Sequence, residues 1–188
     1  YWYEICALSE QATVCLPGLF RESPQGDSEV ARLFEQLGVE TVYGEREVTL
    51  RKTGKITARM EYDFVNQPDL AQTFVVTCVM GIPFRFSGLQ SLKIKETDRI
   101  AALIAEMKKL GYLITESEGS VLSWNGERCT PDTSPCIDTY EDHRMAMAFA
   151  PVCIRLGDIY INHPQVVTKS YPHYWENLIH AGFNITEE

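Results

Sequence analysis

The stretch Ser91–Leu110, SLKIKETDRIAALIAEMKKL, decides how the rest of this chain is interpreted. Its second half repeats apolar residues with a helical period, which predicts an amphipathic helix over residues 97–110. Those apolar residues are Ile100, Leu103, Ile104, Met107 and Leu110. Its first half is crowded with charge, at Lys93, Lys95, Glu96, Asp98 and Arg99. A dense charged cluster therefore lies where the helix begins.

The sign of Arg99 is unexpected, because a helix dipole disfavours a cation in the first turn. An anion lying between the cation and the free N–H groups of the helix end would explain it. The alternative is that the charge run is only a solvated face. The rest of the chain has to distinguish these interpretations.

The composition excludes several classes of protein. With 188 residues, 45% hydrophobic and 23% charged, the chain is long enough for one globular domain with a core. A net charge of −9 argues against nucleic acid or an anionic membrane as partner. There is no apolar run near the roughly 18 residues of a membrane span, and no signal-peptide pattern. Any anionic ligand has to be held by a local cationic pocket.

Cysteine and histidine spacing argues against a metal site. None of the six cysteines forms a CxxC pair, so free buried thiols are favoured over disulfides or metal ligands. No pair of the four histidines has ligand spacing on one helical face. Neither glycine-rich nucleotide motif is present. We expect neither a metal nor a cofactor.

Three glycines that follow predicted helices mark an internal repeat. The pairs Leu37-Gly38, Leu110-Gly111 and Ala181-Gly182 fit left-handed helix C-caps and lie 73 and 71 residues apart. Predicted helices cover residues 2–8, 28–37, 70–80, 97–110, 144–156 and 172–181. Predicted strands cover residues 13–19, 40–43, 47–52, 59–65, 83–89, 113–116, 121–124, 136–139 and 158–162.

Each repeat unit contains one helix that is apolar nearly all round, one amphipathic helix and several strands. We predict a single compact α/β domain over residues 1–188, with pseudo-threefold symmetry and the apolar helices at its centre. Asp27 and Asp69 are expected to cap helices, and Pro151 to kink one. The apolar start, YWYEICAL, suggests the tail of an earlier helix, so we expect the chain to be a piece of a longer protein.

Charged residues recur at equivalent helix starts in the second and third units, which places them on one side of the domain. They are Asp69, Lys95, Glu96, Arg99, His143, Arg144 and Lys169. Arginines bind carboxylate or phosphate in bidentate fashion, and lysines act as point charges. Two neighbouring carboxylates suit a general base and a general acid. The residues predict an enzyme lobe for a small phosphorylated or carboxylated substrate.

Five segments resemble, in order, the 5-enolpyruvylshikimate-3-phosphate synthase family. They are the 25–27 loop, Pro68-Asp69, KETDR at 95–99, DHRMAMA at 142–148 and TKSYP at 168–172. The resemblance implies a fold of two lobes, each made of three βαβαββ units. This chain would be most of the C-terminal lobe, with the N-terminal lobe of the same chain as its missing partner. It further implies a cytoplasmic enzyme, monomeric at full length.

The resemblance also implies a reaction in the shikimate pathway to chorismate and the aromatic amino acids. The family transfers the enolpyruvyl group of phosphoenolpyruvate to the 5-hydroxyl of shikimate 3-phosphate and releases phosphate. It is the target family of the herbicide glyphosate, and it uses no cofactor or metal. The isolated segment is expected to be inactive.

The roles that the resemblance implies are as follows. Arg99, Arg144 and Lys169 match cations that hold phosphoenolpyruvate. Asp69, Lys95 and Ser91 match the shikimate 3-phosphate site, although Ser91 stands where the family often has asparagine. Asp69 is also the favoured base and Glu96 the acid, with His143 in support. Asp69 as a mere helix cap and His143 as a structural residue stay open.

Two other functions remain as alternatives. One is the sister enolpyruvyl transferase that acts on UDP-N-acetylglucosamine. The other is a non-catalytic anion-binding module.

Overall fold

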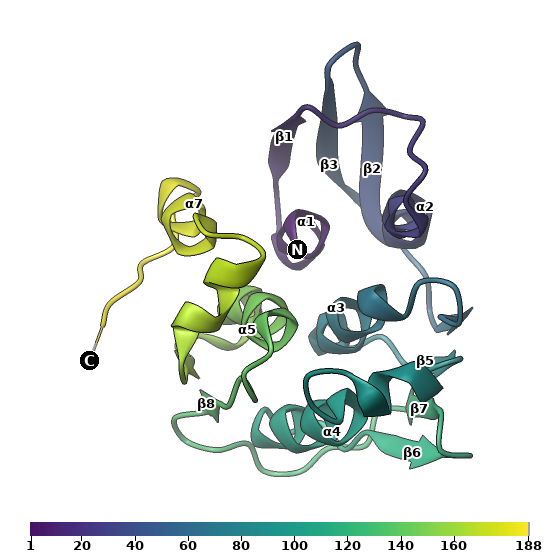
Figure 1. Cartoon of the computed structure of the whole chain (residues 1–188), viewed down its shortest axis with the longest axis vertical. Helices are drawn as coiled ribbons and strands as arrows, with labels where there is room; N and C mark the ends of the chain where they lie inside the picture. The colour runs from purple at the N-terminus through teal and green to yellow at the C-terminus, as the bar shows by residue number, and fades with distance from the viewer. Residues whose placement is uncertain (188) are drawn as a thin grey trace.

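Three mostly buried helices form the centre of the fold in the computed structural model, which describes residues 1–187. They are α1 (Trp2–Leu8), α3 (Ala71–Thr77) and α5 (His143–Phe149), and every residue of α3 is buried. Three helices with one apolar face lie outside them (Figure 1), namely α2 (Val30–Glu35), α4 (Arg99–Lys109) and α7 (Tyr174–His180). The predicted division into central and outer helices is confirmed.

The strands form three sheets. The first is antiparallel, in the order β1-β3-β2, with β1 (Thr13–Pro17), β2 (Leu37–Tyr43) and β3 (Glu47–Ile56). The second has the order β4-β5-β7-β6, with β4 (Met60–Asp63), β5 (Phe84–Ser87), β6 (Thr115–Ser117) and β7 (Val121–Trp124). The third pairs β8 (Cys136–Ile137) with β9 (Tyr160–Ile161).

The sheet topology repeats as the sequence predicted. The order β5-β7-β6 matches β1-β3-β2, and the parallel pair β4–β5 matches β8–β9. Within residues 1–187, only the middle unit, β4-α3-β5-α4-β6-β7, shows the complete βαβαββ order. One prediction is corrected here: the strand expected at 59–65 was placed last in the first unit, whereas β4 pairs with β5 and opens the second.

Several predicted helices are split by 3-10 segments. Pro151 lies in the 3-10 segment Ala150–Val152, which joins α5 to α6 (Cys153–Leu156). At the position of the expected kink, the structure therefore has a turn of 3-10 helix. The helix predicted over 70–80 is α3 flanked by 3-10 turns at Pro68–Leu70 and Cys78–Met80. Further 3-10 segments cover Gly26–Glu29, Gln90–Ile94 and Pro164–Lys169. Asp27 lies inside the first of these three segments and caps no helix with its side chain.

The glycine prediction was right at two positions and wrong at the third. Gly111 and Gly182 follow their helices with φ of 87° and 98°. Gly38, with φ 80°, instead lies within β2 at a bulge between Leu37 and Val39. A Cβ at Gly38 would come within 2.8 Å of a backbone oxygen of β3, so glycine is required there by close strand packing.

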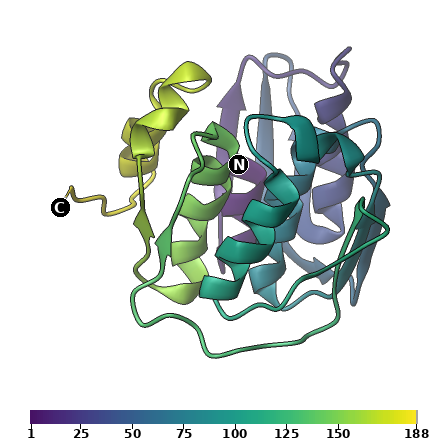
Figure 2. The same cartoon turned by 60° about the horizontal axis from the view of Figure 1, so that its bottom comes forward.

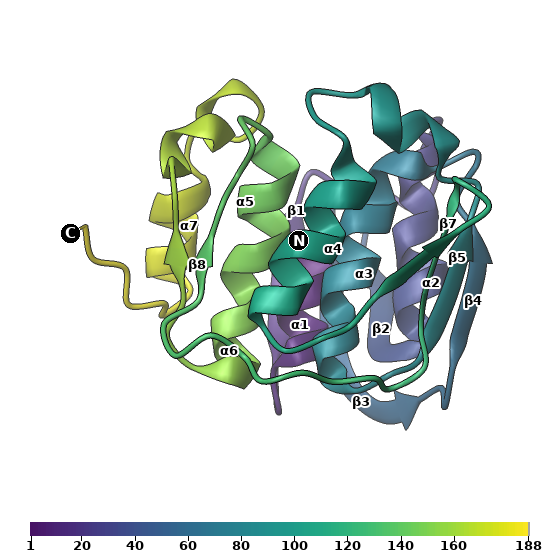
Figure 3. The ribbon, with the colours of Figure 1, turned by 90° about the horizontal axis from the view of Figure 1, so that it is seen from below.

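The helix starts determine where the site lies. Figures 2 and 3 show that α3, α4 and α5 begin at the same end of the molecule. Helix N-termini collected at one end favour bound anions. Within the described residues, no helix is long and apolar enough to cross a membrane.

Candidate active site

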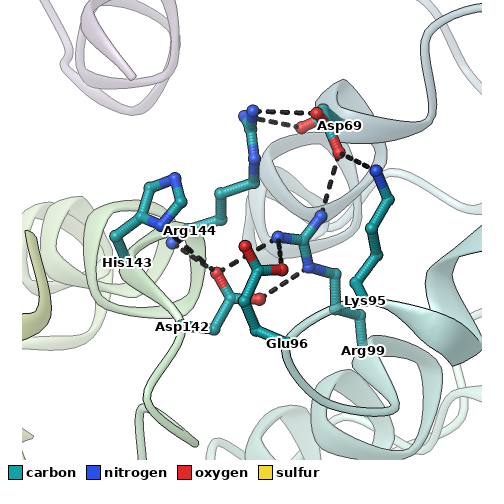
Figure 4. Close-up of polar contacts among 7 residues, drawn as sticks. All are labelled: Asp69, Lys95, Glu96, Arg99, Asp142, His143 and Arg144. Carbon is teal, nitrogen blue, oxygen red and sulfur yellow. Dashed lines mark hydrogen bonds and ion pairs between the residues drawn. The ribbon is translucent and has the colours of Figure 1, made fainter. Parts of the chain in front are cut away.

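Arg99, the first residue of α4, lies at the centre of the candidate site (Figure 4). It is the largest fully buried side chain among the described residues, at 1% exposure. Its Nε donates to Asp142 Oδ2 at 2.6 Å, and its two terminal nitrogens donate to Asp69 Oδ1 at 2.9 Å and Glu96 Oε2 at 2.7 Å. A buried cation is tolerated only when it is paired, and here three carboxylates pair with it.

Asp69 connects the remaining cations to this centre. Arg144 donates to Asp69 Oδ2 at 2.9 Å, and Lys95 Nζ lies 3.5 Å from Asp69 Oδ1. The structure thus brings Asp69 into contact with all three cations, although they are 26 to 75 residues away along the chain. Asp69 lies in a 3-10 turn and caps no helix with its side chain, so the capping prediction was wrong.

Asp142 holds the site together and was not among the predicted site residues. It is fully buried, and besides pairing with Arg99 it accepts the Arg144 backbone N–H at 2.8 Å, which caps α5. One carboxylate therefore neutralises both the buried guanidinium and the helix start. The available signal was an aspartate directly before His143-Arg144, at the predicted helix start. Asp98 caps α4 by accepting the Ala101 N–H at 3.0 Å.

The comparisons with known proteins show which family the chain belongs to. A sequence model of the EPSP synthase (3-phosphoshikimate 1-carboxyvinyltransferase) family matches residues 1–178. The chain belongs to this family. It is 60% identical to the 3-phosphoshikimate 1-carboxyvinyltransferase of Bacteroides fragilis over 98% of this chain and 45% of that protein. It is 35% identical to the same enzyme of Neisseria gonorrhoeae over 87% of this chain and 38% of that protein.

Solved structures share the EPSP synthase fold with this chain. The EPSP synthase of Acinetobacter baumannii has a TM-score of 0.76 at 19% identity, covering 98% of this chain and 45% of that one. The enolpyruvyl transferase NikO of Streptomyces tendae has a TM-score of 0.68 at 17% identity, covering 98% and 42%. The chain thus spans less than half the length of these relatives. The predicted family and α/β lobe are confirmed, and the roles of single residues stay predictions.

The neighbouring charges set the pKa values of the two carboxyl groups predicted to act in EPSP synthase chemistry. Burial alone would raise the pKa of Asp69, but Arg144, Lys95 and Arg99 together lower it below its usual value. A hydrogen bond from its own backbone and the charge of Arg99 lower the pKa of Glu96, against the effect of burial. Both groups are therefore ionised at neutral pH in this structure. For Asp69 this suits a base, whereas Glu96 lacks the proton that an acid needs.

His143 lies beside the cluster, with Nδ1 3.9 Å from Asp142 Oδ1. Burial lowers its pKa below 6.5 despite the carboxylate of Asp142, and Arg144 lowers it further. His143 is therefore neutral at pH 7 and adds no positive charge to the site.

Two predicted residues lie apart from the cluster. Lys169 ends the 3-10 segment Pro164–Lys169 and lines a cavity of about 670 Å³ with Tyr140, Glu141 and His163. Among the described residues it forms no ion pair. Ser91 lies in the 3-10 segment before α4, and its hydroxyl bonds to none of the residues described. Lys169 is exposed and Ser91 is half-buried.

Proposed function

We propose that the full-length protein containing this segment transfers the enolpyruvyl group of phosphoenolpyruvate to the 5-hydroxyl of shikimate 3-phosphate and releases phosphate. The observation that carries the proposal is that Arg99 and Arg144 lie on opposite oxygens of one carboxylate, Asp69. Two guanidinium groups that share a carboxylate can share the carboxylate of a substrate in the same way. Membership of the EPSP synthase family supports this reading.

Phosphoenolpyruvate would bind by exchange of partners. Its carboxylate would take the guanidinium edges that now face Asp69 and Glu96, and Lys169 would take its phosphate. Asp69 would keep Lys95 nearby and turn toward the 5-hydroxyl of shikimate 3-phosphate, with Ser91 and Lys95 contacting that substrate. Arg99 remains in place throughout, because Asp142 still holds its Nε.

The same exchange would let Glu96 take up from solvent the proton that the reaction needs. Removal of the Arg99 contact and arrival of a substrate anion both raise the pKa of Glu96. Glu96 then gives its proton to the methylene carbon of phosphoenolpyruvate, while Asp69 takes the proton of the 5-hydroxyl, whose oxygen bonds to the neighbouring carbon. Loss of phosphate from this adduct and return of one methyl proton to the Glu96 carboxylate restore the double bond. His143 supports Asp142 and Arg144.

The test is phosphate release by the full-length protein with both substrates present. We expect turnover, and a tenfold or larger rise in the KM for phosphoenolpyruvate in Arg144→Ala, because one charge-assisted pair is lost. Arg59→Ala is the matched control, since that arginine pairs with Glu61 at the surface. If thermal stability falls in Arg144→Ala while the KM is unchanged, the assigned role is wrong.

Two outcomes of this assay would separate the alternative functions. Turnover with UDP-N-acetylglucosamine in place of shikimate 3-phosphate would favour the sister transferase. Absence of phosphate release with either acceptor would favour an anion-binding module. We also expect the 188-residue segment alone to be inactive, because the proposal needs a second lobe to enclose the substrates. As part of the same proposal, the full-length enzyme works as a cytoplasmic monomer.

A further inference from the structure

Glu106 is a buried carboxylate that the proposed chemistry does not use. It lies on α4, two turns after Arg99, and has no exposed surface. Its Oε1 accepts the hydroxyl of Tyr140 at 2.7 Å. Its Oε2 accepts the backbone N–H of Asp138 at 3.1 Å and lies 2.7 Å from Lys109 Nζ. Two of these three contacts are with the segment that connects β8 to α5.

That segment contains a strained turn. Tyr140 and Glu141 have φ of 53° and 56°, and the N–H of Asp142 donates to the carbonyl of Thr139 at 2.8 Å. Positive φ at both central residues, with this hydrogen bond, is the pattern of a type I′ turn, which favours Asn-Gly. A tyrosine and a glutamate adopt it only where the surroundings hold them there.

The turn leads directly into the candidate site. Its fourth residue is Asp142, which caps α5 and binds Arg99, and Arg144 follows two positions later. Tyr140 and Glu141 also line the cavity that contains Lys169. A change in the turn would therefore move the start of α5 relative to both Arg99 and Lys169.

We infer that Glu106 is a positioning residue, which holds the Thr139–Asp142 turn through Tyr140 and so fixes where Arg144 meets the substrate anion. The inference rests on the proposed function. Helices α4 and α5, which carry the two arginines, are then joined at two places: by Arg99–Asp142 at their starts and by Glu106–Tyr140 further along α4. Two points of attachment fix the orientation of α5 relative to α4, which a single point would leave free. Binding of one substrate anion by both arginines depends on this orientation.

The contacts of Glu106 favour a carboxylate. Both of its oxygens accept hydrogen bonds, and Oε2 also pairs with the charge of Lys109. A glutamine would lose that charge and could keep Tyr140 only by donating its amide nitrogen to the phenol oxygen. Lys109 also donates to the carbonyl of Cys136 at 2.8 Å, which ties the end of β8 to the same place. Burial and the hydrogen bond to Glu106 raise the pKa of Tyr140 to about 12, so the tyrosine stays a donor at any working pH.

The test removes one hydroxyl in the full-length protein. Tyr140→Phe is compared with Tyr112→Phe, a control whose buried hydroxyl donates to the carbonyl of Val79 at 3.1 Å, away from the site. We expect the KM for phosphoenolpyruvate to rise about fivefold in Tyr140→Phe, the size of one net hydrogen bond, and less than twofold in the control. The value of kcat should stay within twofold in both.

Rescue distinguishes positioning from general stability. Adding Glu141→Gly to Tyr140→Phe should return the KM to within twofold of the wild type, because glycine adopts positive φ without strain. Glu106→Leu, which removes both acceptor oxygens, should raise the KM at least as much as Tyr140→Phe. If Tyr140→Phe and Tyr112→Phe lower the melting temperature alike and neither changes the KM, the inference is overturned.

A second measurement does not depend on turnover. Hydrogen exchange at the backbone amide of Asp142 should be faster in Tyr140→Phe and unchanged in Tyr112→Phe. Equal exchange in both variants overturns the inference, whatever the enzyme does. A wild-type protein that releases no phosphate would overturn the proposed function instead, so the two failures are distinguishable.

Discussion

Replacing Asp142 tests whether the centre of the site is a buried ion pair. Asp142 and Arg99 have side-chain exposures of 0% and 2%, and their closest atoms are 2.6 Å apart. Removal of one partner from a buried pair costs about 3–5 kcal/mol, because the other charge is left without compensation. Asp69 and Glu96 still face Arg99 in the variant, which keeps the cost near the lower limit. Asp142→Ala also loses the helix cap, which contributes about 1 kcal/mol, so we expect it to lower the free energy of unfolding by about 4 kcal/mol.

The helix cap can be separated from the ion pair. Asp142→Asn keeps an oxygen for the Arg144 N–H, so it should lose the charge and retain the cap. Because the cap is retained, the expected loss for Asp142→Asn is about 3 kcal/mol, the contribution of the pair alone. The double variant Arg99→Leu/Asp142→Asn should lose less than the sum of the two single variants, because neither charge is left alone.

The assay is urea unfolding of the segment, followed by tryptophan fluorescence and checked for a two-state transition. Glu61→Ala is the matched control, since Glu61 pairs with Arg59 at the surface with 62% of its side chain exposed. It should cost less than about 1 kcal/mol. If Asp142→Ala costs no more than Glu61→Ala, Arg99 is not held by a buried pair and the account of the site is wrong.

Three further predictions concern the cap, a glycine and pH. Asp98→Ala should destabilise by about 1 kcal/mol in urea unfolding, through loss of the Ala101 bond. Gly88→Ala should destabilise by more than about 2 kcal/mol, because φ is +74° and the new Cβ would lie 2.5 Å from the Val65 nitrogen. The lowered pKa of Asp69 stabilises the fold above its unfolded value of 3.8; that contribution is lost as pH falls below 3.8, and acid unfolding of Asp69→Asn should lack it.

Local structure was predictable where the signals are local. The predicted helix 97–110 matches α4, Arg99–Lys109, to within two residues at its start and one at its end. The agreement is close because the apolar period and the aspartate N-cap are both determined by residues a few positions apart. The order of helices and strands in the three repeat units could also be predicted from the sequence. The predicted C-cap at Gly38 failed because a close approach of β3, a contact between strands, requires glycine there.

Most members of the charged cluster were predictable from the sequence, but Asp142 was not, and the arrangement was predictable only in part. Asp69 was given a local capping role, whereas three cations from other segments surround it. The importance of Asp142 was missed, because its contact with Arg99 spans 43 residues. Contacts over such distances depend on how the helices pack, and the pattern of a single sequence does not contain that information. For the same reason, the sequence could not show that Lys169 lies outside the ion-pair cluster.

Under the proposed function, the charge balance of the cluster would connect substrate binding to proton transfer. Three cations, Lys95, Arg99 and Arg144, face three carboxylates, Asp69, Glu96 and Asp142, so the cluster has no net charge while His143 is neutral. A substrate anion would make it negative unless a proton enters or another cation joins. Glu96 is the most exposed of the three carboxylates and contacts one cation, so it is the easiest to protonate. Under the proposed function, binding of phosphoenolpyruvate would therefore favour protonation of Glu96, the proposed acid, and Lys169 would help to balance the phosphate.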